Sequence, residues 1–391
     1  MTKGESGSLP DGFAEVVRAV WGAPPHDLLT VAGRAFGRYA GGGDARVLLP
    51  DYRQSALVAP DGAATPIANT SAGHAFAAQR PVRDGTDDDL LHVPLTVQGD
   101  RIGVLTVPLP PGAPAPDRLD ELADVLARAL RLADGGTDLY RRLRRRTRLT
   151  VAAEMQWDLL PASAFESAEI AFAGRLEPAY AVWGDHFDWS ASAHGFQLTV
   201  SNGMGTGTEA ASLTHLTVGA LRNARRSGGD IAEQAMLADQ ALYARYRGDR
   251  HVSTLLLDFD YATGRVRTID AGSPRIYRLR GTSADLIGFD AQLPLGMFGD
   301  TRYTIEEFTV ERGDRLVVVS DGVYGSRSPS GEEFGGTPLL NALRDTRLQA
   351  PPEAVGTVIR GYVDFHEGDE PGDDAVVACV DWTGRTVSGG A

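Results

Sequence analysis

Hydrophobic positions recur at helical spacing at both ends of the first 135 residues, with short apolar runs between them. The first helical pattern covers residues 26–39, and Leu119, Leu122, Leu126 and Leu130 form the second. We expect strands in the runs between them, at residues 45–49, 55–59, 91–97 and 103–107. The succession of helix, strands and helix predicts an α+β domain over residues 1–135.

A third helical pattern follows the pair Gly135-Gly136 and extends over residues 137–160. We therefore expect a helical linker at residues 136–160, and a homodimer formed through the first domain and this linker. The linker contains the basic run Arg141–Arg148. Because the run is short and has no aromatic residues, a solvated helix surface explains it better than contact with nucleic acid or a membrane.

Residues 161–385 have the alternating and continuous apolar runs that are typical of β-strands. We predict strands at residues 196–201, 254–259, 266–270, 276–279, 305–310, 315–320 and 375–380. Helical patterns occupy residues 209–226, 230–246, 337–346 and 352–365. Because the helices come in pairs and do not alternate with the strands, the pattern favours a β-sandwich flanked by helices over a doubly wound parallel sheet.

Charge and composition exclude several classes of protein. The 391 residues include 38 Lys and Arg against 52 Asp and Glu, so the net charge is −14, which argues against a partner made of nucleic acid. The single cysteine, Cys379, excludes internal disulfides and cysteine-based zinc sites. Neither a long apolar stretch nor the apolar core of a signal peptide is present, so we expect a cytoplasmic protein without a membrane partner.

Acidic or amide side chains stand beside glycine at four predicted strand ends. The four segments are Gly184–Asp188, Ser201–Gly207, Ser320–Gly322 and Gly372–Asp374. One Asp-Gly pair is typical of an ordinary turn, but four such signals at strand ends favour a common site. Hard oxygen ligands of this kind suit Mg²⁺ or Mn²⁺, and two such ions sharing one carboxylate activate water against a phosphoryl group.

Taken in order, these motifs resemble those of the metal-dependent PPM-type protein serine/threonine phosphatases, in particular the SpoIIE/RsbU branch. Residues 152–381 carry further parts of the resemblance: the turn Leu159-Leu160-Pro161, the segment Asp270–Pro274, where the family usually has Asn-Ala-Gly-His-Pro, and the loop Leu293–Gly296. The domain at residues 1–135 is similar to a GAF sensor domain, and a sensor in front of the phosphatase domain is a usual arrangement in this branch.

The resemblance implies a metal site and a reaction. By motif position, Asp185, Asp321 and Asp373 would be metal ligands together with the Gly203 carbonyl, and Asn202 takes the bridging position. Asp188 and Asp374 would support these ligands without binding the metal themselves, or serve only as turn residues. The cofactor would be Mn²⁺ or Mg²⁺, as two ions or one, and the metal-activated water would be the only catalytic group. The substrate would be a phosphoserine or phosphothreonine on a regulatory protein of the anti-anti-sigma type, under the control of the GAF-like domain.

Asn202 is the main departure from the family, which has an aspartate that bridges the two metals at this position. A pair of unit charges ~4 Å apart at an effective dielectric of ~20 is worth roughly 4 kcal/mol, so the lost charge would weaken metal binding by on the order of a thousandfold. Two hypotheses follow. Asp185, Asp321 and Asp373 favour a working phosphatase with an altered metal site, whereas Asn202 favours a catalytically impaired pseudophosphatase that binds an anti-anti-sigma-type partner.

Overall fold

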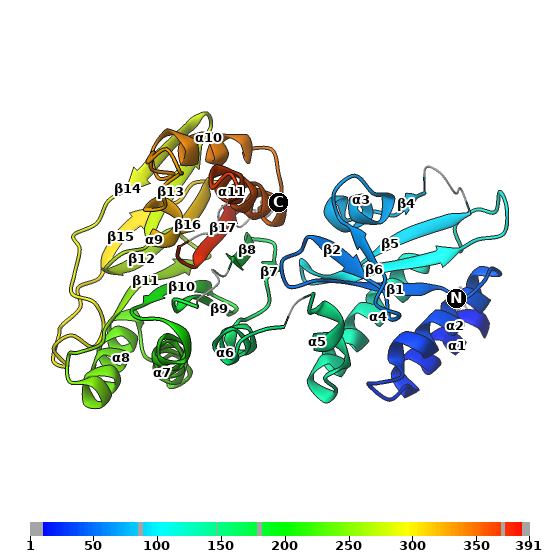
Figure 1. Cartoon of the computed structure of the whole chain (residues 1–391), viewed down its shortest axis with the longest axis horizontal. Coiled ribbons are helices and arrows are strands. Elements are labelled where there is room, and N and C mark those ends of the chain that lie inside the picture. Colours follow the sequence, from blue (N-terminus) through cyan, green and yellow to red (C-terminus); the bar gives the residue numbers. More distant parts are fainter. Residues whose placement is uncertain (1–10, 85–88, 147, 178–181, 369–371, 385–391) are drawn as a thin grey trace, which may run out of the picture. The chain divides into compact units, whose positions relative to one another are not determined.

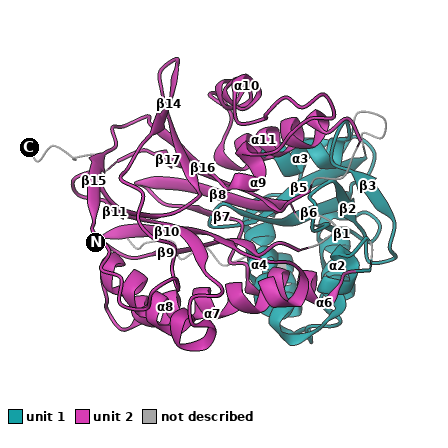
Figure 2. Ribbon diagram, turned by 60° about the vertical axis from the view of Figure 1, so that its left-hand side comes forward, with its two compact units in different colours: residues 1–148 teal, residues 149–391 magenta. Residues whose placement is uncertain are grey.

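The chain forms two compact units, Met1–Arg148 and Leu149–Ala391, which Figure 2 distinguishes by colour. The computed structural model describes residues 11–84, 89–146, 148–177, 182–368 and 372–384. In the described part of the chain, none of the helices is both long enough and apolar enough to span a bilayer.

Unit 1 is built on one antiparallel sheet with the strand order β3-β2-β1-β6-β5-β4. Its strands are β1 (Arg46–Pro50), β2 (Ala56–Val58), β3 (Ala64–Pro66), β4 (Val82–Arg83), β5 (Leu90–Val97) and β6 (Asp100–Pro108). Its helices are α1 (Asp11–Gly22), α2 (Leu28–Ala40), α3 (Ser71–Ala78), α4 (Leu119–Ala133), the 3-10 turn η1 (Asp134–Gly136) and α5 (Leu139–Arg144). The predicted order of helix, strands and helix is present, and α1 and α3 were not predicted.

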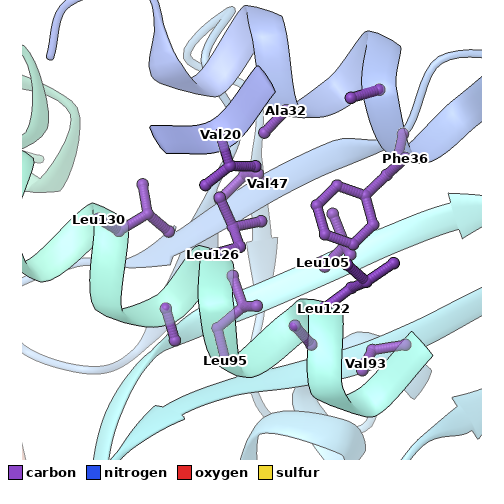
Figure 3. Packing of buried hydrophobic residues seen from close by; sticks show 14 of the residues in the cluster. Val20, Ala32, Phe36, Val47, Val93, Leu95, Leu105, Leu122, Leu126 and Leu130 are labelled. Atoms are coloured by element: carbon purple, nitrogen blue, oxygen red, sulfur yellow. The ribbon is translucent and has the colours of Figure 1, made fainter. Parts of the chain in front are cut away.

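The leucine stripe of α4 forms the main core of unit 1. Leu122 and Leu126 are fully buried against Phe36 of α2 and Leu105 of β6 (Figure 3). Neighbouring residues of a strand point to opposite faces, so Leu48 of β1 joins a second cluster on the other side of the sheet, with α3. Both faces of the sheet are therefore covered by helices.

The single helix predicted over residues 137–160 is wrong. Helix α5 ends at Arg144, Arg145 is extended, and α6 (Val151–Leu159) begins only after Thr150, whose side chain caps it by accepting a hydrogen bond from Ala153 N. Arginines at i, i+4 spacing repel one another on a helix, and an N-cap threonine favours a new start, so the basic run interrupts the helix. Within this run, Thr147 lies outside the described residues.

Unit 2 contains two antiparallel sheets, with strand orders β15-β12-β11-β10-β9 and β14-β13-β16-β17-β8-β7. The strands are β7 (Ala164–Glu166), β8 (Ile170–Glu177), β9 (Asp185–Ala191), β10 (Gly195–Gly203), β11 (Val252–Asp260), β12 (Arg265–Ala271), β13 (Arg275–Arg280), β14 (Ser283–Ile287), β15 (Glu306–Thr309), β16 (Arg315–Val319) and β17 (Ala375–Trp382). The helices are α6, α7 (Gly207–Arg226), α8 (Ile231–Tyr246), α9 (Asp321–Tyr324), α10 (Thr337–Asp345) and α11 (Pro351–Phe365).

The predicted β-sandwich flanked by helices is confirmed. Aromatic side chains from both sheets, among them Phe172, Phe196 and Phe259, fill the space between the sheets. Helices α7 and α8 cover the outer face of the first sheet, and α10 and α11 cover that of the second (Figure 1). This packing fixes the strand ends at which the acidic motifs lie.

Candidate active site

The first two motifs face each other across adjacent strands. Asp185 opens β9 and lies opposite Asn202 near the end of β10. Gly184 has φ +95°, and a Cβ atom there would lie 3.0 Å from Thr214 Oγ1, so glycine suits both the backbone angle and the space. The carbonyl of Gly184 accepts hydrogen bonds from Thr214 Oγ1 at 2.7 Å and from Gly203 N at 3.3 Å. These bonds hold the two strand ends against α7.

The third and fourth motifs meet at the neighbouring strands β16 and β17 of the other sheet. Asp321 is the first residue of α9, directly after β16, and Asp374 directly precedes β17. A Cβ atom on Gly322 would lie 1.9 Å from the carbonyl oxygen of Asp374, so only glycine lets the two segments approach this closely. The close approach brings the third and fourth motifs together.

Asp374 connects its own segment to two others in unit 2, helix α6 and residues 183–184. Its Oδ2 accepts hydrogen bonds from Gln156 Nε2 at 2.8 Å, Trp183 N at 2.8 Å and Gly184 N at 3.1 Å. Gln156 Nε2 also donates to the backbone oxygen of Asp185 at 2.9 Å. Asp374 therefore holds the segment before Asp185 in place and connects it to α6.

Asp185 is fully buried, and neither of its carboxylate oxygens has a hydrogen-bond partner among the described residues. Burial raises its pKa well above the usual value, the negative charges of Asp374, Asp373 and Asp321 raise it further, and the nearby Ser320 side chain acts in the opposite direction without meeting the geometry of a hydrogen bond. Burial, followed by the charge of Asp321, raises the pKa of Asp373 to about 7. The four aspartates therefore converge in space and repel one another.

Asn202 is bonded to Asp321. Its side-chain Nδ2 donates to Asp321 Oδ1 and, at 3.2 Å, to Ser273 Oγ. Burial raises the pKa of Asp321, while hydrogen bonds from Ser273 and Asn202 act in the opposite direction. The amide of Asn202 thus satisfies part of the hydrogen-bonding capacity of the Asp321 carboxylate.

Asp188 lies apart from this group. It is buried within β9, where its carboxylate accepts hydrogen bonds from Arg222 Nη2 at 2.7 Å and Arg225 Nη2 at 3.0 Å, both on α7. These partners hold its pKa below the usual value in spite of its burial. Asp188 therefore ties β9 to α7.

The site fits a divalent cation in its chemistry. Among the described residues, no group of three or more His, Cys, Asp or Glu side chains forms a ready-made metal-ligand set. The carboxylate oxygens of Asp185 nevertheless have no hydrogen-bond partner among these residues, and Asp321 and Asp373 repel its negative charge, so a bound cation would stabilise the group. Carboxylate oxygens are ligands that Mg²⁺ and Mn²⁺ accept.

Sequence reasoning missed the residues that support the aspartates. Thr214 lies 30 positions from Gly184, and Gln156 lies 218 positions from Asp374, so no local pattern pairs them. The only sequence signal for Gln156 is its place just before the Leu-Leu-Pro turn, and its burial is seen only in the structure.

Comparisons with known proteins agree with this architecture. Residues 192–383 match the family model described as Stage II sporulation protein E (SpoIIE). The solved SiaA-PP2C domain of Pseudomonas aeruginosa is similar at 20% identity and a TM-score of 0.51, covering 59% of this chain and 94% of that one. No match was found among curated proteins.

Two further solved structures are similar over part of their own length. The PP2C phosphatase domain of SpoIIE from Bacillus subtilis, with a fragment of its regulatory domain, is 19% identical with a TM-score of 0.50, covering 56% of this chain and 63% of that one. The RsbU and RsbW domains of a Mycobacterium tuberculosis protein are 18% identical with a TM-score of 0.50, covering 56% and 61%. This chain thus spans less than two thirds of either, and at such identities the likeness establishes the PP2C-type fold.

Proposed function

We propose, from the match of residues 192–383 to the SpoIIE family model, that this chain is a metal-dependent phosphatase of phosphoserine or phosphothreonine in a regulatory protein. The observation that carries the proposal is the buried carboxylate of Asp185, which has no hydrogen-bond partner among the described residues and is surrounded by three further aspartates. A buried charge of this kind is expensive unless a partner neutralises it, and a divalent cation would do so.

Asp185, Asp321 and Asp373 would hold the cation, with the carbonyl oxygen of Gly203 as a further ligand. When bound, Mn²⁺ or Mg²⁺ lowers the pKa of a water molecule and withdraws charge from phosphoryl oxygens. Asp374 would position the ligands through Gln156, Trp183 and Gly184. No side chain is proposed as a nucleophile.

The hydrogen bond from Asn202 to Asp321 supports one cation in this site over two. An amide that donates to Asp321 turns its nitrogen toward the carboxylate, so its single oxygen points elsewhere and cannot be shared as a bridging carboxylate would be. The same bond favours a second candidate function, a pseudophosphatase that binds an anti-anti-sigma-type partner, because Asp321 is satisfied there without a metal.

Control by the first unit is the third part of the proposal. Unit 1 has its own sheet and core, as a GAF-like sensor would. Gln156 of α6 contacts both the backbone of Asp185 and the carboxylate of Asp374, so a displacement of α6 would reach the site. We propose that a signal sensed by unit 1, in a homodimer, acts through this helix.

Phosphate release from a phosphoserine peptide at about 2 mM Mn²⁺, a concentration chosen for a weak site, tests the proposal. Wild type is compared with Asn202→Asp and Asp321→Ala, and with Asp364→Ala, which removes an exposed aspartate of α11. Turnover by wild type and Asp364→Ala but not by Asp321→Ala supports the phosphatase. Turnover by Asn202→Asp alone supports the pseudophosphatase, and no turnover by any variant contradicts the metal site.

A further inference from the structure

Arg275 stands beside the segment that carries Asp321. It is the first residue of β13 and lies opposite Val319 of β16, two positions before Asp321. Its guanidinium carbon lies 3.7 Å from the ring centre of Tyr324, which is the last residue of the short helix that Asp321 begins. Stacking on an aromatic face orients a guanidinium and leaves its N–H groups available at its edge.

Tyr324 is itself anchored to the wall of the site. Its hydroxyl donates to the backbone oxygen of Ser273 at 2.7 Å, and the hydroxyl of Ser273 receives the Nδ2 hydrogen of Asn202. Burial raises the pKa of Tyr324, Asp321 raises it further and Arg275 lowers it, so both charges act on the same phenol. Tyr324 therefore connects Arg275 to the short helix that Asp321 begins.

The guanidinium of Arg275 is exposed and, within the described ranges, has neither an ion-pair nor a hydrogen-bond partner. Three other arginines of unit 2 have carboxylate partners. Arg222 and Arg225 pair with Asp188, and Arg250, which lies beside Gly205, pairs with Glu209 at 3.1 Å. The donors of Arg275 are thus left for a ligand.

The charge of the site shows which ligand suits these donors. Asp185, Asp321 and Asp373 would repel a dianionic phosphoryl group. Because Asn202 favours one bound cation over two, less positive charge would be present to offset these carboxylates. A guanidinium presents a planar fork of N–H groups that matches phosphate oxygens in a bidentate contact. The positive charge of Arg275, next to the helix that Asp321 begins, would attract the phosphoryl group that the aspartates repel.

We infer that Arg275 recognises the phosphoryl dianion of the substrate and is a specificity-determining residue of this site. The inference rests on the proposed function, in which the substrate is a phosphoserine or phosphothreonine. Tyr324 is its positioning residue, because the ring holds the guanidinium and does not itself reach the ligand.

Calorimetric titration of the Mn²⁺-loaded full chain with inorganic phosphate tests the inference. Arg275→Gln is expected to weaken phosphate binding at least about tenfold, as for the loss of a charge-assisted hydrogen bond. Arg275→Lys, which keeps the charge but loses the fork, is expected to fall between wild type and Arg275→Gln. The matched control is Arg312→Gln, which removes an exposed arginine before β16, at the end of that strand opposite to Asp321.

Mn²⁺ binding, followed by electron paramagnetic resonance, is expected to be unchanged in Arg275→Gln, because this residue is not a ligand. Equal phosphate affinity of wild type and Arg275→Gln would overturn the inference, as would the absence of phosphate binding to wild type. Tyr324→Phe keeps the stacking ring and is expected to bind phosphate more tightly than Tyr324→Leu. The reverse order would contradict the positioning role.

Kinetics separate the failure of this inference from failure of the proposed function. In a working phosphatase, Arg275→Gln is expected to raise KM for a phosphoserine peptide about tenfold with a smaller change in kcat. Turnover with an unchanged KM overturns the role of Arg275 and leaves the phosphatase intact. Phosphate binding through Arg275 without any turnover by wild type overturns the phosphatase and leaves the recognition role intact.

Discussion

Asn202 donates a side-chain hydrogen bond to the carboxylate of Asp321, a residue 119 positions further along the chain that follows strand β16 of the other sheet. The amide thus links the end of β10 to the start of α9 without any metal. A carboxylate at position 202 would repel Asp321 until a cation joined them. The identity of this one residue therefore sets how strongly the fold depends on metal.

Asn202→Asp is expected to lower the stability of the metal-free protein and to increase its response to Mn²⁺. In EDTA the variant loses a hydrogen bond to a charged group, which is worth about 1–3 kcal/mol, and gains a like-charge contact. Thermal unfolding with EDTA and with Mn²⁺ measures both effects. Asn223→Asp, on the exposed face of α7, is the control and is expected to behave as wild type. An unchanged Tm of Asn202→Asp in EDTA would contradict this interpretation.

Asp188→Asn is expected to destabilise unit 2 more at neutral pH than in acid. The pKa of Asp188 is held below its usual value of 3.8, so its contribution is complete above about pH 4 and is lost as the pH falls through the lowered pKa. Breaking this buried pair is expected to cost about 3–5 kcal/mol at pH 7. Urea unfolding at pH 7 and pH 3 checks the difference, with the exposed Asp345→Asn as a control. A deficit of equal size at both pH values would show that Asp188 does not act through its charge.

Gln156→Leu is expected to loosen α6 and the segment before Asp185. The variant removes the donor to Asp374 and to the Asp185 backbone, so a loss of about 1–3 kcal/mol follows. Hydrogen exchange is expected to be faster at α6 and at the amides of Trp183 and Gly184. Val151→Ala, which shortens a largely exposed side chain of the same helix, is the control. Unchanged protection in Gln156→Leu would mean that packing alone holds α6.

The same substitution at two glycines is expected to have opposite effects. Gly322→Ala would place a Cβ atom 1.9 Å from the Asp374 carbonyl oxygen and is expected to destabilise by about 1–3 kcal/mol or more. Gly219→Ala meets no atom within 4 Å on the exposed side of α7 and is expected to stabilise by about 0.5–1 kcal/mol. Denaturant unfolding of both variants measures the two signs. A neutral Gly322→Ala would mean that β16 and β17 separate easily at their ends.

Strand β9, which sequence analysis missed, has polar residues among its buried positions. Strand β9 contains Asp185, His186 and Asp188, all buried, so it lacks the apolar alternation by which β10 and β11 were predicted. Partners for these buried polar side chains come from other parts of the chain. For Asp188 the partners are Arg222 and Arg225 of α7. Hydrophobic periodicity is a local signal and contains no information about such partners.

The sequence by itself determined the sandwich strands with clear alternation, the paired helices and the strand-end positions of Asp321 and Asp373, because each depends on residues close together in the chain. Only the tertiary structure decided that Asn202 bonds to Asp321. It also decided that Arg275 stacks on Tyr324. Those contacts join separate segments, so they exist only once the packing of the two sheets has brought the strand ends together.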